Sequence, residues 1–276
     1  MSPIPTTPII VRAAGVDVLR RAGAPGGTPV VLLHGVGSNA SSFEPLAEAL
    51  DPELDVYAWD APGYGASQPL AMEAPHPSDY ADALTGVLDA LNLGRVVLVG
   101  HSLGSLFAGS FAATRTARVA ALALLSPALG YRVATGAALP PNVQNRIDDI
   151  ERLGPEAFAA SRAGRLVYAP EKNADVLARV RSAMAALNKT GYAQAVRALG
   201  HGDLLADAAR ITAPTCVVIG AEDTVTPPAG ARALHAALTN PLEYQEIAAT
   251  GHALPQEAPI AVARLLEKFV KEARHD

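Results

Sequence analysis

The chain has 276 residues, of which 50% are hydrophobic and 18% are charged, so it is long enough and apolar enough to bury a large core. Its formal net charge of −5 excludes the basic composition typical of nucleic-acid-binding proteins. No uninterrupted apolar run reaches the roughly 18 residues that a membrane span needs. We therefore expect a globular protein that binds neither nucleic acid nor a membrane.

The first residues and the single cysteine bear on where the protein works. Residues 1–15 lack the charged segment and the following apolar segment of a secretory signal peptide. Cys216 is the only cysteine, which excludes an intramolecular disulfide. It stands in an apolar run, where a buried and unreactive thiol is expected. We predict a cytoplasmic location.

Short β-rich runs alternate with helical patterns, which is typical of a mostly parallel sheet with helices on both faces. The first two runs are joined by three residues and predict an antiparallel hairpin. Several later runs are continuously apolar, as strands buried on both faces must be. The predicted strands are, in chain order, residues 9–12, 16–21, 30–33, 55–59, 96–99, 119–125, 216–219 and 242–247. The fold class predicted is α/β with an eight-stranded sheet.

Three helices can be placed between these strands. Ser78 can cap a helix whose apolar face includes Tyr80 and Leu84, and Gly94 would end it. A second helix, over residues 103–114, directly follows a strand and carries small residues that permit close packing on the sheet. The last is predicted over residues 259–271.

Residues 129–205 read as helices without a strand, and many glycines and prolines divide them. We interpret this segment as a helical lid inserted into an α/β core of residues 1–128 and 206–276; the alternative is a few extra helices at the periphery. The segment is rich in cations, any of which could bind a carboxylate on a substrate, although helix cations are usually solvated. These cations are Arg146, Arg152, Arg162, Arg165, Arg179, Arg181, Lys189 and Arg197.

The strongest chemical signal is the run Gly-His-Ser-Leu-Gly at residues 100–104, between a predicted strand and a predicted helix. A tight strand-to-helix turn forces strained backbone angles, so small residues must flank the central one. The turn would project the hydroxyl of Ser102 above the sheet edge, next to the N–H groups of the helix N-terminus. Ser102 is therefore the predicted nucleophile.

A serine hydroxyl needs a base, and the base needs an acid that holds its tautomer. His252 follows the last predicted strand and Asp223 follows the strand before it, so both stand on loops at strand carboxyl ends. The order serine, aspartate, histidine is the one that this architecture requires. Glu222 is the alternative acid, but we favour Asp223 because its side chain is shorter and two prolines follow it closely.

A tetrahedral intermediate also needs two N–H donors for its oxyanion. Leu103, directly after the nucleophile, and Val36, between two glycines after the strand at 30–33, are the predicted donors. Further candidates for substrate contacts are His34, His101, Lys189 and His201, of which His201 has a capping or surface role as its alternative. This chemistry requires no metal and no cofactor.

The sequence resembles the α/β-hydrolase superfamily over nearly the whole chain outside the lid. The resemblance is carried by the oxyanion loop at 34–35, the D-x-x-G-x-G-x-S turn at 60–67, the elbow at 100–104, the acid loop at 220–227 and the base loop at 251–259. Residues 190–193, 203–204 and 211–214 are similar to small-substrate carboxylesterases and 3-oxoadipate enol-lactonases. Haloalkane dehalogenases and epoxide hydrolases of this superfamily carry Asp at the elbow, where this chain has Ser102.

The resemblance implies a serine hydrolase that cleaves an ester or lactone of a small molecule through an acyl-Ser102 intermediate. Two alternatives stay open. One is a hydrolase of carbon–carbon or amide bonds with the same residues, although carbon–carbon hydrolases often carry Asn where this chain has His101. The other is a ligand receptor, or a cofactor-free lyase or oxygenase, that keeps the fold without net hydrolysis. The oligomeric state does not follow from the sequence.

Overall fold

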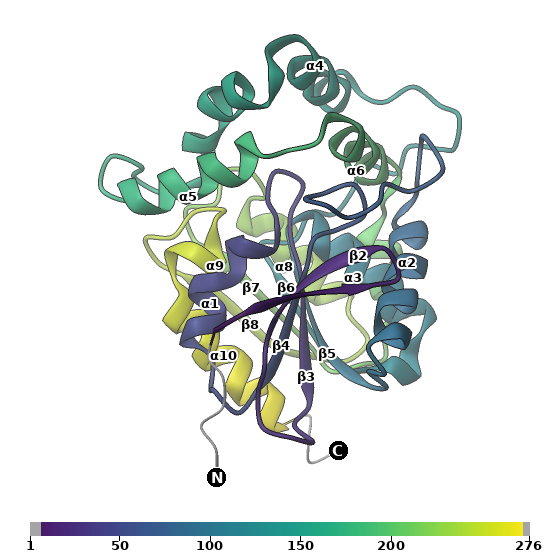
Figure 1. The fold of residues 1–276 in the computed structure, drawn as a ribbon, viewed down its shortest axis with the longest axis vertical. Helices are drawn as coiled ribbons and strands as arrows, with labels where there is room; N and C mark the ends of the chain where they lie inside the picture. Colours follow the sequence, from purple (N-terminus) through teal and green to yellow (C-terminus); the bar gives the residue numbers. More distant parts are fainter. Residues whose placement is uncertain (1–6, 273–276) are drawn as a thin grey trace.

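Eight strands form one sheet in the computed structural model, which describes residues 7–272 (Figure 1). Their order across the sheet is β1-β2-β4-β3-β5-β6-β7-β8. β1 and β2 form the predicted antiparallel hairpin, β2 also pairs antiparallel with β4, and all other pairs are parallel. The strands are β1 (Ile9–Ala13), β2 (Val16–Arg21), β3 (Pro29–Leu33), β4 (Asp55–Trp59), β5 (Val96–His101), β6 (Val119–Leu125), β7 (Thr215–Gly220) and β8 (Pro241–Ile247). The predicted eight-stranded, mostly parallel sheet is confirmed, with strand ends that differ by one or two residues.

Helices cover both faces of the sheet. The α-helices are α1 (Glu44–Ala49), α2 (Pro77–Ala90), α3 (Leu103–Thr114), α4 (Pro141–Arg162), α5 (Ala174–Ala185), α6 (Lys189–His201), α7 (Leu204–Ala208), α8 (Pro228–Ala237), α9 (Leu254–Glu257) and α10 (Pro259–Glu272). Residues 7–272 also form the short 3-10 helices η1 (Ala40–Phe43), η2 (Thr116–Arg118) and η3 (Ala163–Leu166). None of the helices within the described residues is both long and apolar enough to cross a membrane.

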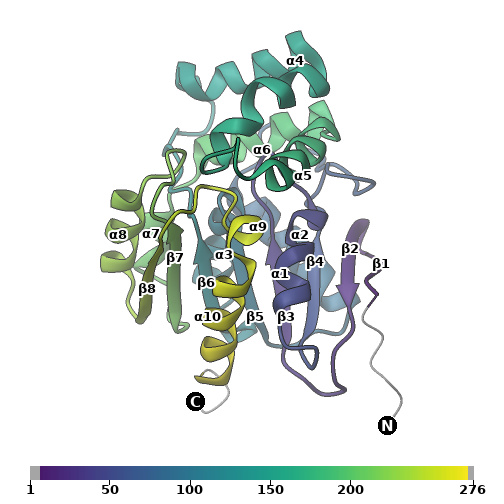
Figure 2. The same cartoon turned by 90° about the vertical axis from the view of Figure 1, so that its left-hand side faces the viewer.

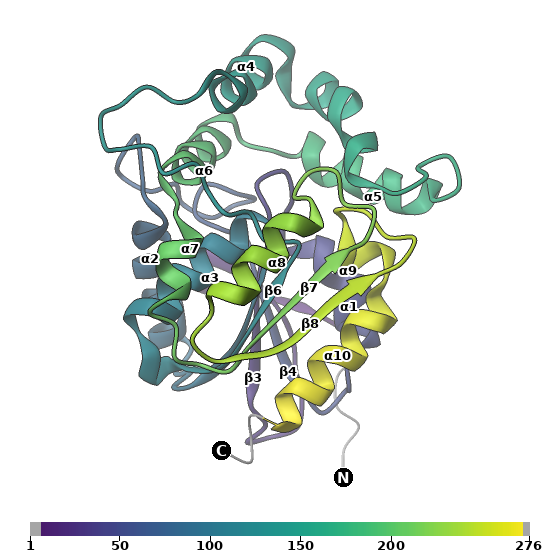
Figure 3. The same ribbon diagram turned by 180° about the vertical axis from the view of Figure 1, so that it is seen from behind.

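Alternate residues of each central strand enter two separate apolar clusters, one on each face. On β3, Val31 and Leu33 pack with α2, α3 and α8, whereas Val30 and Leu32 pack with α1 and α10. Cys216 is buried in the second cluster, as its apolar surroundings in the sequence predicted. Figure 1 shows α1, α9 and α10 to the left of the central strands and α2 and α3 to their right, and Figure 3, from behind, shows α8 in front of the strands. The continuous apolar runs of the sequence thus reflect burial on both faces.

Helix α2 buries the predicted face but has different ends. Its N-cap is His76, whose N–H donates to the Asp79 carboxylate at 2.6 Å, and Ser78 lies inside the first turn. Pro77 occupies the first helical position, where its missing N–H costs nothing and its fixed φ suits the helix. At the other end the helix stops at Ala90, and Asn92, with φ of 55°, turns the chain before Gly94 is reached. Both predicted ends were therefore wrong.

Between β6 and β7 the described chain contains helices and no strand. Helices α4, α5 and α6 gather beyond one end of the sheet (Figure 2). Helix α4 is kinked at Gly154, which has φ of 75° and precedes Pro155. Helix α7 packs on α3, with the Leu204 side chain against Gly109, so the proposed lid boundary at residue 205 falls inside a helix of the core. We propose residues 129–203 as the lid.

The lid meets the core at a contact between two glycines. A Cβ on Gly191, in α6, would lie 2.0 Å from the carbonyl oxygen of Gly63, which has φ of 85° in the turn after β4. The atoms that such a Cβ would meet belong to the backbone of Gly63, so no flexible side chain could move to make room for it. Only glycines therefore allow α6 to approach the core this closely.

We expect Gly191→Ala to lower the free energy of unfolding by about 1–3 kcal/mol, because the added methyl group must displace backbone. Urea denaturation compared with wild type measures this loss. Gly94→Ala is the matched control, since a Cβ there meets no atom within 4 Å. Equal stability of the two variants would contradict the close contact between lid and core.

Candidate active site

Ser102 stands on a strained turn between β5 and α3. Its backbone has φ of 53° and ψ of −116°, and its N–H donates to the carbonyl of Leu125 at 2.9 Å. A Cβ on Gly104 would lie 2.1 Å from the carbonyl oxygen of Leu33, and one on Gly100 would lie 2.5 Å from that of Gly104. The glycines on either side of Ser102 thus let strand and helix approach closely enough to form the turn.

The structure brings the three residues of the predicted triad together. The Oγ of Ser102 lies 3.0 Å from Nε2 of His252, and Nδ1 of His252 lies 2.8 Å from Oδ2 of Asp223. All three residues are at most 6% exposed. Since a carboxylate only accepts, Nδ1 carries the proton and Nε2 is left to accept one from the serine hydroxyl.

The loop after β7 holds Asp223 through its backbone and one hydroxyl. Oδ1 of Asp223 accepts the N–H groups of Val225 and Thr226 at 2.8 and 2.9 Å. Oδ2 accepts the Thr226 hydroxyl at 2.9 Å as well as the His252 proton. The neighbouring Glu222 is exposed, and only its backbone N–H is bonded here. The geometry therefore favours Asp223 over Glu222, as the sequence did.

Thr226 was not predicted as a site residue. Its hydroxyl lies 2.9 Å from the Asp223 carboxylate and 3.3 Å from Nδ1 of His252, so it contacts both partners of that pair. The signal that could have found it is a hydroxyl residue three positions after an aspartate in a strand-end loop, where it can bond the carboxylate locally.

Two pKa shifts describe the charge state of the site. Burial alone would raise the pKa of Asp223, but the hydrogen bond and charge of His252 and the loop N–H groups lower it to about 2. Burial, together with the charge of His252, lowers the pKa of His101 to about 3. The site therefore holds an ionised Asp223 and a neutral His101 near neutral pH.

The two predicted oxyanion donors lie beside Ser102. Leu103 is the first residue of α3, and Val36 follows Gly35 in the loop after β3; both line the same pocket as Ser102. Among residues 7–272 neither N–H donates to another residue, so both are open to an incoming ligand. The Tyr64 hydroxyl donates to the Val36 carbonyl at 2.7 Å and fixes the loop. The strand order changes direction between β3 and β5, which is where α/β sheets form their binding crevice.

His34 does not line the pocket, contrary to its prediction as a substrate contact. Its Nδ1 donates to the Gly35 carbonyl at 2.8 Å, and its Nε2 accepts the N–H of Ala61 at 3.0 Å. Burial lowers its pKa, so the ring stays neutral and both nitrogens are used. His34 instead ties the loop after β3 to the loop after β4.

Of the other three predicted contacts, only His101 lines the pocket. Its Nε2 donates to the carbonyl of His252 at 2.8 Å, so it also holds the backbone of the base. Lys189 and His201 lie elsewhere. Lys189 pairs with Glu151 at 3.3 Å, and His201 stacks on His76 with ring centroids 4.2 Å apart. Because the side chains of Lys189 and His201 contact these partners outside the pocket, we do not propose them as substrate contacts.

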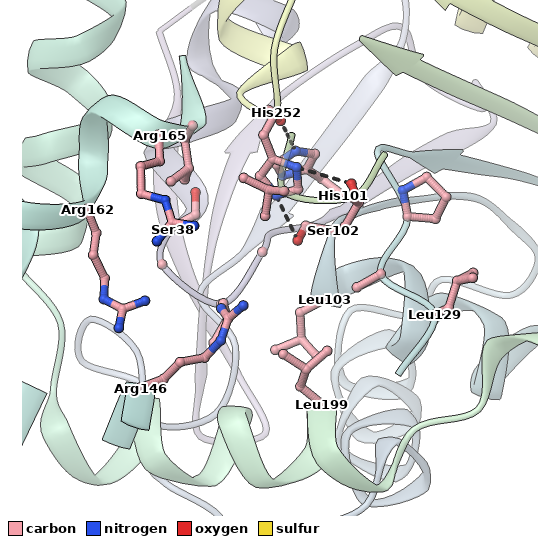
Figure 4. A pocket seen from close by; sticks show the side chains of 18 of the residues that line it. Ser38, His101, Ser102, Leu103, Leu129, Arg146, Arg162, Arg165, Leu199 and His252 are labelled. Atoms are coloured by element: carbon pink, nitrogen blue, oxygen red, sulfur yellow. Dashed lines mark hydrogen bonds between the residues drawn. The ribbon is translucent and has the colours of Figure 1, made fainter. Parts of the chain in front are cut away.

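A cavity of about 490 Å³ extends from Ser102 and His252 into the lid (Figure 4). This volume suits a small organic molecule. Its apolar wall includes Leu129, Phe158, Met184 and Leu199, and its cationic wall consists of Arg146, Arg162 and Arg165. All three arginines are among the eight lid cations that the sequence analysis considered for binding a substrate carboxylate.

Glu257 links the base loop to the lid. Its carboxylate accepts the N–H of Gly251 at 3.1 Å. It also accepts, at 2.8 Å, the N–H of Tyr168, which lies in the lid two residues after the end of η3. Beside it, the N–H of Ala253 donates to the carbonyl of Leu166 at 2.9 Å. The loop that carries His252 is therefore bonded to the segment that carries Arg165. In the sequence, Glu257 falls within the base loop at 251–259, which carries part of the family resemblance, and no separate role was predicted for it.

Comparisons with known proteins agree with the fold described above. Residues 28–259 match the model of the alpha/beta hydrolase fold family. A relative from Acinetobacter baylyi, (E)-2-((N-methylformamido)methylene)succinate hydrolase, is 34% identical over 71% of this chain and 73% of its own length. The poly(3-hydroxyalkanoate) depolymerase of Ectopseudomonas oleovorans is 29% identical over 92% of this chain and 88% of its own. The crystal structure of the enol-lactonase from Burkholderia xenovorans LB400 superposes with a TM-score of 0.84 at 24% identity, covering 95% of this chain and 100% of that one.

The ionised Asp223 predicts how stability depends on pH. Its folded-state pKa of about 2 lies below the ordinary 3.8, so its contribution is complete above the ordinary pKa and is lost as pH falls through about 2. The shift corresponds to about 2 kcal/mol. We expect the free energy of unfolding to fall more steeply in this acid range for wild type than for Asp223→Asn.

Urea titrations at a series of acid pH values measure this difference. Glu222→Gln, at an exposed neighbour, should keep the wild-type slope. Parallel pH profiles of wild type and Asp223→Asn would mean that the fold does not stabilise the ionised form.

Proposed function

The chain belongs to the α/β-hydrolase family, and on that premise we propose that it is a serine hydrolase that cleaves an ester or lactone of a small molecule through an acyl-Ser102 intermediate. The observation that carries the proposal is the continuous hydrogen-bonded series from Ser102 Oγ through His252 to Asp223, with distances of 3.0 and 2.8 Å. Ser102 and His252 line the same cavity as Val36 and Leu103, whose N–H groups donate to no other residue among residues 7–272.

Acylation follows from this arrangement. As the Ser102 oxygen attacks the substrate carbonyl, Nε2 of His252 accepts the hydroxyl proton. The imidazole becomes a cation beside the ionised Asp223 carboxylate, which stabilises it and holds Nδ1–H in place. The carbonyl oxygen becomes an oxyanion between the N–H groups of Val36 and Leu103, which are already oriented before the substrate arrives.

The collapse of this intermediate requires a proton for the leaving oxygen. His252 supplies it from Nε2, so an alcohol departs from an ester, whereas in a lactone the alcohol stays attached to the acyl group. A water molecule then attacks the acyl-Ser102 carbonyl while His252 takes its proton. As this second intermediate collapses, the bond between the carbonyl carbon and Ser102 Oγ breaks, His252 returns the proton to Oγ, and the acid product leaves. The lactonase name of the Burkholderia xenovorans protein, which shares this fold, supports including lactones with esters.

We expect Ser102→Ala to remain folded and to lose several orders of magnitude in kcat, because the triad acts as a unit. Hydrolysis of p-nitrophenyl acetate measures the loss, and labelling by a fluorophosphonate reports the nucleophile directly. Ser182→Ala, at an exposed lid serine, is the control and should label normally. Near-normal turnover by Ser102→Ala would remove this serine from the mechanism and favour a different reaction on the same fold.

The two adjacent acids give a second test. Asp223→Asn should lower kcat roughly 10⁴-fold, because the amide allows the wrong tautomer of His252. Glu222→Gln should cost little, since that side chain is exposed and contacts neither partner. The same p-nitrophenyl acetate assay ranks the two variants, and the reverse ranking would show that the neighbour is the acid.

A further inference from the structure

Three arginines of the lid point into the cavity that holds Ser102 (Figure 4). Arg146 and Arg162 stand on α4, and Arg165 stands on η3. No aspartate or glutamate is among the residues that line this cavity. The chain as a whole has more acidic than basic residues, 27 against 22. The charge of the pocket is therefore opposite to that of the molecule.

One of these three charges is already compensated. Arg162 pairs with the Asp149 carboxylate at 2.7 Å, and its guanidinium lies 4.9 Å from the ring centroid of Phe158. The same carboxylate binds Arg152 at 2.9 Å, outside the pocket. Hydrogen bonds from Arg162 and Arg152 lower the pKa of Asp149, so it stays ionised. Arg162 is thus held as part of the wall.

The other two charges are not compensated. Among the described residues neither Arg146 nor Arg165 has a carboxylate within ion-pair distance. Arg146 contacts the hydroxyl of Tyr192, which is neutral because burial raises its pKa. Two guanidinium groups therefore face an otherwise largely apolar cavity with no protein anion beside them. Arg146 is half-buried, so less water competes there for a bound anion, whereas Arg165 is exposed and adds a second positive charge at the same wall of the pocket.

The other cations of the lid differ from Arg146 and Arg165 in that they lie outside the pocket or form ion pairs. Arg197 and Lys189 pair with carboxylates of the surface, and Arg179 and Arg181 are exposed outside the pocket. The placement of Arg146 and Arg165 is therefore not the general pattern of a cationic lid. It is specific to the wall that faces Ser102.

We propose that the pocket selects esters or lactones that carry a second, free carboxylate, which Arg146 and Arg165 bind while the reacting carbonyl lies at Ser102. The proposal rests on the proposed function and names its substrate class. A planar carboxylate matches the fork of N–H donors on a guanidinium, and two such groups can share its oxygens. The apolar wall suits the hydrocarbon between the two ends.

The bound carboxylate would serve the reaction by orientation. Energy gained at this remote group holds the carbonyl against Ser102 and reaches the transition state, so it raises kcat/KM. Because the attraction is electrostatic, it weakens with added salt. A neutral substrate of the same shape gains none of this.

The test compares two substrates that differ in one charge, monomethyl glutarate and dimethyl glutarate, by pH-stat assay at neutral pH. Wild type should prefer the monoester by at least about tenfold in kcat/KM, which is about 1.4 kcal/mol. Arg146→Met and Arg165→Met should each reduce kcat/KM for the monoester about tenfold and leave the diester within about twofold. Arg179→Met is the matched control and should change neither. Arg146→Lys keeps the charge and should retain part of the preference, which separates lost binding from misfolding.

A binding measurement is independent of turnover. Glutarate titrated calorimetrically into Ser102→Ala should bind, with an affinity that falls in Arg146→Met or Arg165→Met backgrounds and with rising sodium chloride. Inorganic phosphate is the competing anion, and equal binding of phosphate would overturn the assignment to a carboxylate.

The outcomes separate this proposal from the proposed function. If p-nitrophenyl acetate is hydrolysed but the diester is preferred, or the methionine variants do not change the preference, the carboxylate site is refuted and the serine hydrolase stands. If Ser102 is neither labelled nor needed for turnover, the proposed function fails. In that case the glutarate titration still decides: arginine-dependent binding keeps the anion site, and its absence removes it.

Discussion

The turn at Ser102 is the constraint on which the rest of the site depends. A non-glycine residue with φ of 53° costs of order 1–3 kcal/mol and persists only where its surroundings impose it. Here the surroundings are the parallel strands β3, β5 and β6 and the helix α3, which approach so closely that Gly100 and Gly104 have no room for a side chain. The result is a hydroxyl fixed at the sheet edge. The positions useful for a base, an acid and two N–H donors are then set relative to that one oxygen.

The second requirement is that the buried carboxylate of Asp223 keeps its charge, and nearby groups provide the hydrogen bonds that this needs. Asp223 can stay ionised while inaccessible because two loop N–H groups, the Thr226 hydroxyl and His252 all donate to it. His101 and Glu257 then hold the backbone on either side of the base, at the His252 carbonyl and the Gly251 N–H. The site is thus a network in which each polar atom orients the next, and it includes groups that never touch a substrate.

The core and the lid contribute different parts of the site. The reacting groups come from loops of the sheet, whereas the cationic wall comes from α4 and η3, which are inserted between β6 and β7. The two parts are joined through the shared apolar cluster and through specific contacts, among them the close approach of Gly63 to Gly191 and the bonds of Glu257 to both the base loop and the lid segment. A lid joined in this way can vary the charge of the pocket without disturbing the reaction chemistry, because no lid residue belongs to the triad.

The sequence by itself determined the sheet and the positions of the triad. Strands buried on both faces are continuous apolar runs, and the loops that follow parallel strands meet at one edge, so chain order alone brings Ser102, Asp223 and His252 to the same place. Only the tertiary structure decided which side chains face the cavity. His34, Lys189 and His201 turned out to have other partners, whereas Arg146 and Arg165, two of eight similar lid cations, face Ser102. The reason is physical: the direction of a side chain on a lid helix depends on how that helix packs on a distant part of the chain, and no local pattern records that packing.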